Sequence, residues 1–364
     1  MKKILTAADV DKNFAVEASM CSDGIAFFDV RKEPFKVYGL YDHKNQTEFK
    51  RLPDEIGLNV NDGVTRLYKN TAGGRVRFCT DSDVIAIKTV MSGVGHMSHF
   101  SLTGVAAFDL YVDFPESGTS RFKKTFIPPY DIQTGYESKV DMKTRKLRYY
   151  TINFPTYSCV EALYIGVREG CEIGRGMPYS NALPIVYYGS SITQGGCASR
   201  PGAVYSAVVS RRMNLDYVNL GFSGSGKGED VIVDYMASLP MCAFVSDYDH
   251  NSPTEDLART NRNLYEKIRE AHPEIPYIMM SKCDVDDNFS ENLDRRALIY
   301  ENYRYARDNG DQNLYYIDGA SVYRGPYDDF CTVDGIHPND LGFALIADAM
   351  CAELKRAFTQ RIMN

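Results

Sequence analysis

The spacing of apolar residues along this chain changes at about residue 184, and this change constrains the fold more than any other feature. Before it, apolar residues alternate with polar ones or form short runs, with Gly, Asp, Ser and Pro between them. The clearest runs are RVRFCT (75–80), VIAIKTVM (84–91), FDLYVDF (108–114), RYYTINF (148–154) and ALYIGV (162–167). No long amphipathic helix pattern lies among them. Short strands separated by turn residues predict an antiparallel β-sandwich.

After residue 184, strand patterns alternate with helix patterns. The predicted strands are PIVYYG (184–189), DYVNLG (216–221), CAFVSD (242–247), PYIMMS (276–281) and NLYYIDG (313–319). The predicted helices cover 201–213, 229–239, 256–272, about 293–308 and about 340–358. Such alternation indicates a parallel sheet with helices on both faces. We therefore predict two domains, a β-sandwich over 1–175 and an α/β domain over 183–364, joined by a linker over 168–184.

Composition excludes two classes of partner. The net charge is −7 and the signs are interspersed, whereas a nucleic-acid partner requires a basic face. The longest apolar runs have five to seven residues, and a membrane helix needs about 18 or more. The first residues, MKKILTAADVDKN, lack the apolar core of a secretory signal, so we expect a cytoplasmic protein. The sequence gives no oligomeric state.

No metal or cofactor site is predicted. The nine cysteines are irregularly spaced without a C-x-x-C pair, which favours reduced thiols. His96 and His99 have a spacing that zinc could use, but no third ligand is near them in the sequence. The segment DVDDNFSENLDR (284–295) imitates a calcium loop, yet it has Phe289 in place of the turn glycine and Arg295 in place of the bidentate glutamate.

The loop GFSGSGKG (221–228) is close to a phosphate-binding P-loop. It ends in Gly228, however, where a P-loop needs the Ser or Thr that holds Mg²⁺. A flexible turn, or an anion pocket made of backbone N–H groups, fits it better. In open α/β sheets, sites form beyond the carboxyl ends of the strands, so this loop and the segments 189–191, 247–251 and 281–282 are the candidates.

Two serines and two possible bases compete for a catalytic role. The stretch VYYGSSITQGG (186–196) places Ser190 and Ser191 directly after a predicted strand. Two of the six histidines have a carboxylate three positions earlier, which could orient an imidazole and stabilise its charged form. These pairs are Asp334 with His337 and Asp247 with His250. Spacing alone does not choose between them.

The order of these motifs resembles that of the SGNH (GDSL-type) hydrolases over the whole second half. The matching positions are Gly189-Ser190-Ser191-Ile192, Gly221-x-x-Gly224, Asn251 and Asp334-x-x-His337. The first half resembles the N-terminal domain of one branch of that family. Its Gly-x-Asp-Leu-Tyr signature stands here as Ala107-Phe108-Asp109-Leu110-Tyr111, with Ala in place of Gly.

The resemblance implies a three-layer, flavodoxin-like second domain and a role for each motif residue. Ser191 is the nucleophile and Ser190 takes the place of the family's Asp. His337 is the base, and Asp334 orients it. The oxyanion donors are Ser191, Gly224 and Asn251, although the sequence around Asn251 departs from the family pattern. The Gly-x-Ser-x-Gly motif of α/β-hydrolases is missing from both serine loops.

The implied activity is ester hydrolysis through an acyl-enzyme, without metal or cofactor. A short acyl group, with acetyl favoured, on a carbohydrate is the expected substrate. A thioesterase or acyltransferase with the same triad is the second reading, and a carbohydrate-binding protein with a decayed site is the third. We expect the sandwich to pack beside the catalytic loops, because the linker is short and lacks a Gly/Ser or Pro spacer. Alternatively, the sandwich only covers an apolar face of the sheet in the second domain.

Overall fold

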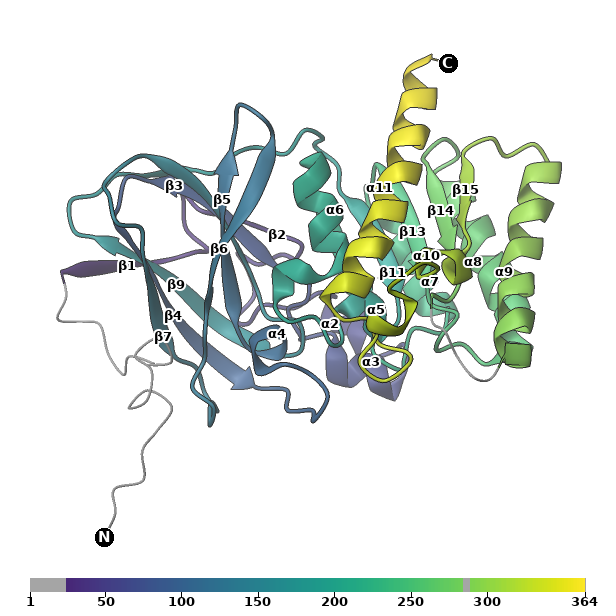
Figure 1. Cartoon of the computed structure of the whole chain (residues 1–364), viewed down its shortest axis with the longest axis horizontal. Helices are drawn as coiled ribbons and strands as arrows, with labels where there is room; N and C mark the ends of the chain where they lie inside the picture. The colour runs from purple at the N-terminus through teal and green to yellow at the C-terminus, as the bar shows by residue number, and fades with distance from the viewer. Residues whose placement is uncertain (1–23, 284–288, 364) are drawn as a thin grey trace, which may run out of the picture.

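The structure is a computed structural model that describes residues 24–283 and 289–363. Within those residues, the first half of the chain forms a β-sandwich and the second half an α/β domain, and the two lie side by side (Figure 1). Both predicted fold classes are confirmed. None of the described helices is long and apolar enough to cross a membrane.

The sandwich consists of two antiparallel sheets with a shared core. The smaller sheet has the order β1 (Ile25–Asp29), β9 (Cys159–Arg168), β4 (Val84–Gly93) and β7 (Glu137–Asp141). The larger has the order β10 (Ile173–Arg175), β3 (Arg75–Thr80), β8 (Arg148–Asn153), β5 (Phe108–Phe114) and β6 (Thr119–Phe126), and β2 (Lys36–Tyr38) pairs with β3. Short helices α2 (Asp54–Gly57), α3 (Asp62–Leu67) and α4 (Leu102–Val105) connect the strands. Since β10 pairs with β3, the predicted linker 168–184 is wrong over its first part.

The second half has a parallel sheet of order β12-β11-β13-β14-β15. The strands are β11 (Ile185–Gly189), β12 (Tyr217–Gly221), β13 (Ala243–Asp247), β14 (Tyr277–Met280) and β15 (Leu314–Ile317). This is the doubly wound order of flavodoxin-like folds. Each strand is buried on both faces, which explains its continuous apolar sequence.

Helices cover both faces of this sheet. One face packs on α6 (Tyr205–Met213) and α11 (Asp340–Met363), and the other on α7 (Asp230–Ser238), α8 (Thr254–Ala271) and α9 (Phe289–Asp308). The connections carry α5 (Ser191–Gln194), η2 (Pro201–Ala203), α10 (Gly319–Val322) and η3 (Asp328–Phe330). The helix predicted over 201–213 is divided, because Val204 has an extended ψ of 139° between η2 and α6.

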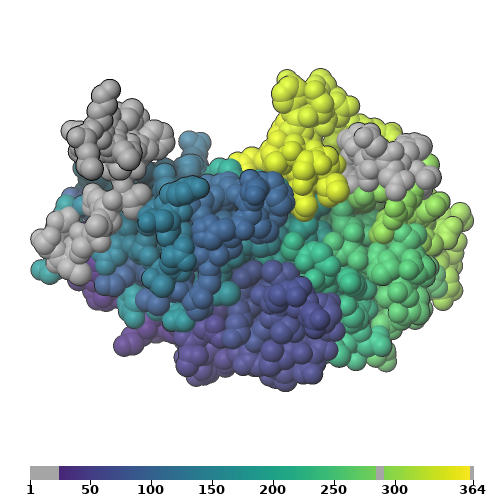
Figure 2. All heavy atoms as spheres, turned by 90° about the horizontal axis from the view of Figure 1, so that it is seen from below, coloured from purple at the N-terminus to yellow at the C-terminus, as the bar shows by residue number. Residues whose placement is uncertain are grey.

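The two halves share core residues. Leu52, Val64 and Tyr68 of the first half pack in the apolar cluster that fills the α7–α9 face of the parallel sheet. In the opposite direction, Cys197 of the second half is buried in the core of the sandwich. The dark blue segment that contains α2 and α3 lies against the green residues of the second half (Figure 2). The halves are therefore joined by a common core and not by a tether.

Candidate active site

Ser191 stands on a tight turn at the carboxyl end of β11. A Cβ on Gly189, the last residue of the strand, would collide with the Thr193 hydroxyl and with the carbonyl oxygen of Asp247, so only glycine fits there. Ser190 is the N-cap of α5, because its Oγ accepts from the Ile192 N–H at 3.2 Å. The turn therefore assigns Ser190 a capping role and presents the next residue, Ser191, at the end of the sheet.

The structure brings Ser191, His337 and Asp334 into one chain of hydrogen bonds. Ser191 Oγ lies 2.9 Å from His337 Nε2, and His337 Nδ1 lies 2.7 Å from Asp334 Oδ2. An ionised carboxylate can only accept, so Nδ1 carries the ring proton and Nε2 is free to accept from the serine hydroxyl. The other Asp334 oxygen accepts from the backbone N–H groups of His337 (2.7 Å) and Ile336 (3.1 Å), which fixes the loop between η3 and α11.

The ionisation of Asp334 suits this arrangement. Partial burial alone would raise its pKa. The backbone and ring hydrogen bonds from His337, with the N–H of Ile336, outweigh that effect and hold the pKa of Asp334 below its ordinary value. The carboxylate is therefore charged at neutral pH and can stabilise a protonated imidazole.

Asp247, from the competing pair, has a different environment. Its Oδ2 accepts from the Thr193 hydroxyl (3.2 Å), and its carbonyl oxygen accepts from the Ser190 N–H (3.1 Å). Complete burial, with Asp249 nearby, raises its pKa well above the ordinary value. Asp247 thus holds the turn that carries Ser191. The hydroxyl of Ser191 itself is hydrogen-bonded to His337.

Gly224 belongs to a loop that lies against the nucleophile turn. A Cβ on Gly221, where the loop begins, would collide with the backbone N of Gln194, and the Ser223 N–H donates to Gln194 Oε1 at 3.0 Å. Gly224 has φ = 66°, a conformation that favours glycine. Over residues 24–283 and 289–363, the N–H groups of Ser191 and Gly224 donate to no hydrogen-bond acceptor. Both are available for a ligand.

Asn251 lies in the turn after β13, with its backbone N–H bonded to the carbonyl of Tyr248 (3.0 Å). Its Oδ1 is buried and has no hydrogen-bond partner in the described part of the chain. This oxygen can only accept a hydrogen bond, whereas an oxyanion would need the Nδ2 donor of the same amide. The oxyanion role of Gly224 and Asn251 stays a prediction.

Comparisons with known proteins agree with this organisation. The family model described as the N-terminus of SGNH-hydrolase-type esterases, GxDLY, matches residues 25–173. The model of the GDSL-like lipase/acylhydrolase family matches residues 182–355. Residues 182–355 belong to the GDSL-like lipase/acylhydrolase family, and residues 25–173 match the N-terminal domain of SGNH-hydrolase-type esterases. Among curated protein sequences, none matches this acylhydrolase.

Solved structures share both halves of the acylhydrolase. A protein described as a GDSL-like lipase from Bacteroides ovatus ATCC 8483 has a TM-score of 0.82 at 26% identity, over 92% of this chain and 98% of that one. The salicylyl-acyltransferase SsfX3 from a tetracycline biosynthetic pathway has a TM-score of 0.70 at 20% identity, over 92% and 98%. An acetyl xylan esterase, Est2A, from the rumen bacterium Butyrivibrio proteoclasticus has 0.57 at 11% identity, over 92% and 99%. The last two similarities show the fold alone.

The sandwich reaches the predicted catalytic residues through two aromatic side chains. The Tyr157 hydroxyl donates to the backbone carbonyl of Ser191 at 3.3 Å. The ring of Phe100 lies 4.9 Å from the ring of Tyr157 and 5.8 Å from that of His337. The sandwich therefore packs beside the catalytic loops, as the short linker predicted. Sequence reasoning missed both residues, since neither belongs to a motif.

Gln194 is a second connection that the sequence did not reveal. Its Nε2 donates to Asn70 Oδ1 and to the Thr156 carbonyl, both at 3.2 Å and both in the first half. Its Oε1 accepts from Ser223 in the glycine loop. One fully buried amide therefore joins the sandwich, the nucleophile turn and the loop of Gly224.

The Asp-Leu-Tyr signature of the first half also lies at this seam. Asp109 accepts from the N–H of Gly202 (2.9 Å) and from the amide of Asn153 (2.8 Å), and burial raises its pKa. Tyr111 packs so closely on Gly202 that a Cβ there would overlap its ring. The signature thus fixes the segment that follows the nucleophile turn.

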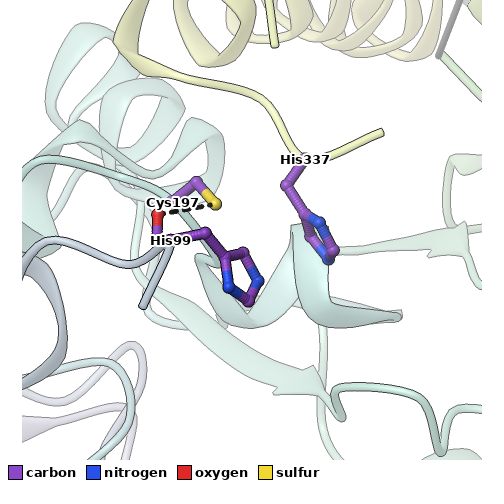
Figure 3. A group of neighbouring side chains, drawn as sticks. All are labelled: His99, Cys197 and His337. Atoms are coloured by element: carbon purple, nitrogen blue, oxygen red, sulfur yellow. Dashed lines mark hydrogen bonds between the residues drawn. The ribbon is translucent and has the colours of Figure 1, made fainter. Parts of the chain in front are cut away.

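The structure places His99, one of the two histidines with zinc-like spacing, beside residues that the sequence did not link to it. Its ring lies 5.6 Å from that of His337, and Cys197 lies close to both (Figure 3). Burial, with Asp334 nearby, raises the pKa of the Cys197 thiol to about 12, so the thiol is neutral at ordinary pH. The calcium-like segment 284–295 begins outside the described residues, which omit 284–288.

Proposed function

We propose that this protein is a serine esterase that hydrolyses short acyl esters, with acetyl esters of carbohydrates as the substrate class. The hydrogen-bonded chain from Ser191 through His337 to Asp334 carries the proposal. A serine hydroxyl becomes an effective nucleophile only when an oriented base takes its proton, and this chain has that arrangement.

The proposed reaction has two steps. Ser191 Oγ attacks the ester carbonyl while His337 Nε2 takes the hydroxyl proton, and Asp334 stabilises the resulting imidazolium. The tetrahedral intermediate carries an oxyanion, for which the N–H groups of Ser191 and Gly224 and the amide of Asn251 are the donors. His337 then returns the proton to the leaving alcohol, and water releases the acyl group by the same route.

The substrate class has support from a hollow beside the catalytic residues. It has a volume of about 640 Å³, and Phe100, His96, Tyr130, Asp131 and Gln133 are among its lining residues. Tyr130 is 92% exposed, and an exposed aromatic face next to carboxylate and amide groups suits the apolar face and hydroxyls of a sugar ring. Phe100, which borders this hollow, also lies 5.8 Å from the ring of His337, so the hollow adjoins the proposed catalytic residues.

The test is hydrolysis of nitrophenyl acetate by the full chain and by two neighbouring serine variants. We expect Ser191→Ala to lose about 10⁴-fold or more in turnover, because it removes the nucleophile. Ser190→Ala is the matched control. It should retain most activity and lose about 1 kcal/mol of stability with its cap. A phenylmethylsulfonyl reagent should label Ser191.

Four outcomes would contradict the proposal. Loss of activity in Ser190→Ala with retention in Ser191→Ala would move the nucleophile by one residue. Acetate release from none of a panel of acetylated oligosaccharides would overturn the substrate class. Faster product formation as a new ester, when an acceptor alcohol is added, would identify an acyltransferase. A chain that binds oligosaccharides and hydrolyses no ester would be a binding protein.

A further inference from the structure

His99, Cys197 and His337 form a group of metal-ligand atoms that spans the two halves (Figure 3). His99 comes from the sandwich loop between β4 and α4, Cys197 follows α5, and His337 precedes α11. One ring nitrogen of each histidine and the cysteine sulfur all lie within 4.8 Å of one another. No local sequence pattern contains this group, because the fold assembles it from three distant segments.

Imidazole nitrogen and thiolate sulfur are ligands that zinc prefers. Zinc binds them at about 2.0–2.3 Å in a tetrahedral arrangement, which places neighbouring ligand atoms roughly 3.3–3.8 Å apart. The three atoms here would need to close by up to about 1.5 Å to reach that spacing. His99 can supply the movement, since its side chain is exposed on a loop. Three protein ligands leave a fourth position for water.

The surroundings already orient two of the ligands. Asp334 holds the Nδ1–H of His337, which is the carboxylate–histidine arrangement that supports zinc in many proteins. The Cys197 thiol donates to the backbone carbonyl of His99 at 3.5 Å, so the sulfur stays next to the loop that carries the third ligand. The Cys197 backbone has φ = 67°, a conformation that side-chain-bearing residues rarely adopt.

We propose that His99, Cys197 and His337 bind one zinc ion, and that the bound ion reversibly inhibits the enzyme. Both histidines bind as neutral imidazoles, and the Cys197 thiol releases its proton to solvent as the sulfur–zinc bond forms. The ion occupies the Nε2 lone pair of His337, which must take the proton of Ser191. The inhibition rests on the proposed esterase function, whereas the binding does not.

Binding is tested without any activity measurement. The full chain is freed of metal with EDTA, dialysed, and titrated with zinc chloride by calorimetry. It is then titrated with cobalt(II), whose bond to a thiolate gives a near-ultraviolet absorption band. We expect one ion per chain and the thiolate band. Cys197→Ser should lose the band, and His99→Ala should bind zinc at least tenfold more weakly.

Matched substitutions show whether the site is specific. His96→Ala changes another exposed histidine of the same loop, and Cys171→Ser changes a remote cysteine of the sandwich. Both should bind zinc as the unchanged chain does. His99→Gln keeps the side-chain size and serves if His99→Ala fails to fold. No binding by the unchanged chain, or equal binding by the Cys197 and His99 variants, would overturn the site.

Inhibition is tested by nitrophenyl acetate hydrolysis with zinc or with EDTA, each variant normalised to its own rate in EDTA. We expect at least a tenfold loss at saturating zinc, recovery with EDTA, and a zinc concentration for half-inhibition at least tenfold higher in His99→Ala. A rate that rises with zinc, or no change at saturation, would overturn the inhibitory role. A chain that binds zinc at this site but hydrolyses nothing in EDTA would refute the proposed function and leave the metal site intact.

Discussion

The two halves of the chain meet at the active site in different ways. The parallel sheet of the second half presents Ser191 at the end of β11, and the loop before α11 adds His337 and Asp334. The sandwich contributes none of these three side chains. Its Tyr157 and Asn70 instead hold the backbone of Ser191 and the side chain of Gln194. The proposed reacting groups come from the second half, and part of the framework that holds them comes from the first.

Arg51 shows how deeply the first half enters the second. Its buried guanidinium donates to the carbonyl of Gly221 (2.5 Å) and to that of Leu67 (2.7 Å), and lies 4.5 Å over the ring of Phe222. Burial lowers the pKa of Arg51 to about 9. Gly221 begins the loop that carries Gly224, so an arginine of the sandwich half fixes the start of the predicted oxyanion loop. The first half is therefore part of the framework of the candidate active site.

The strongest test of this comparison is to remove the first half. We expect a fragment that begins at about Asn181 to be insoluble or unfolded and to hydrolyse neither nitrophenyl acetate nor an acetylated oligosaccharide. The fragment lacks Leu52, Val64 and Tyr68, which fill the core beneath α7 and α8. Each such side chain contributes about 1.5–3 kcal/mol by burial, and a whole domain is stable by only about 5–15 kcal/mol.

Solubility, circular dichroism and both hydrolysis rates are compared with the full chain, purified in the same way. A folded fragment that hydrolyses both esters at the rate of the full chain would contradict the view that the sandwich is part of the active-site framework. The sandwich would then neither stabilise the site nor shape it.

The next largest effect is expected within the second half. Asp334→Asn should lower kcat by about 10⁴-fold with a smaller change in KM, because an amide can donate to Nδ1 of His337 and thereby favour the wrong tautomer. His250→Ala is the control from the competing Asp-x-x-His pair and should retain activity. Steady-state kinetics on nitrophenyl acetate decide between them. An inactive His250→Ala together with an active His337→Ala would reverse the assignment of the base.

Asn251→Ala should have an intermediate effect. Loss of one oxyanion donor typically costs about 2.7–4 kcal/mol in the barrier, so we expect kcat to fall about 10²–10³-fold. Asn263→Ala removes a surface amide from α8 and should have no such effect. If Asn251→Ala keeps full turnover, the oxyanion hole consists of backbone N–H groups without this side chain.

The sequence predicted what is local or periodic. Strand lengths and the change from a period of two to a helical period identified both fold classes, and motif order placed Ser191, Asp334 and His337, whose hydrogen bonds the structure describes. Contacts between distant segments leave no such pattern. The position of Leu52 in the core of the second half and the bond from Tyr157 to the nucleophile turn depend on how the domains dock.

Two smaller differences concern single elements. The predicted helix over 201–213 is interrupted at Val204, where the chain is extended between η2 and α6. Strand β10 lies in a stretch that resembles a linker in composition, and pairing with β3 makes it a strand. At β10, pairing with a neighbouring strand overrides the local composition.

Tyr157→Phe is expected to have the smallest effect and gives the finest test of the comparison. The variant removes only the hydroxyl that donates to the Ser191 carbonyl, and the ring still packs on Phe100. A single hydrogen bond contributes about 0.5–1.5 kcal/mol, so kcat should fall less than about tenfold, with a similar small loss in the free energy of unfolding. Tyr157→Ala also removes the ring and should cost about 3–5 kcal/mol of stability, because it leaves a cavity at the seam.

Kinetics and thermal unfolding are measured on both variants and on Tyr303→Phe, a control in α9. If Tyr157→Phe lowers kcat as much as Asp334→Asn does, without a loss of stability, the hydroxyl takes part in the chemistry, and the first half supplies more than a framework.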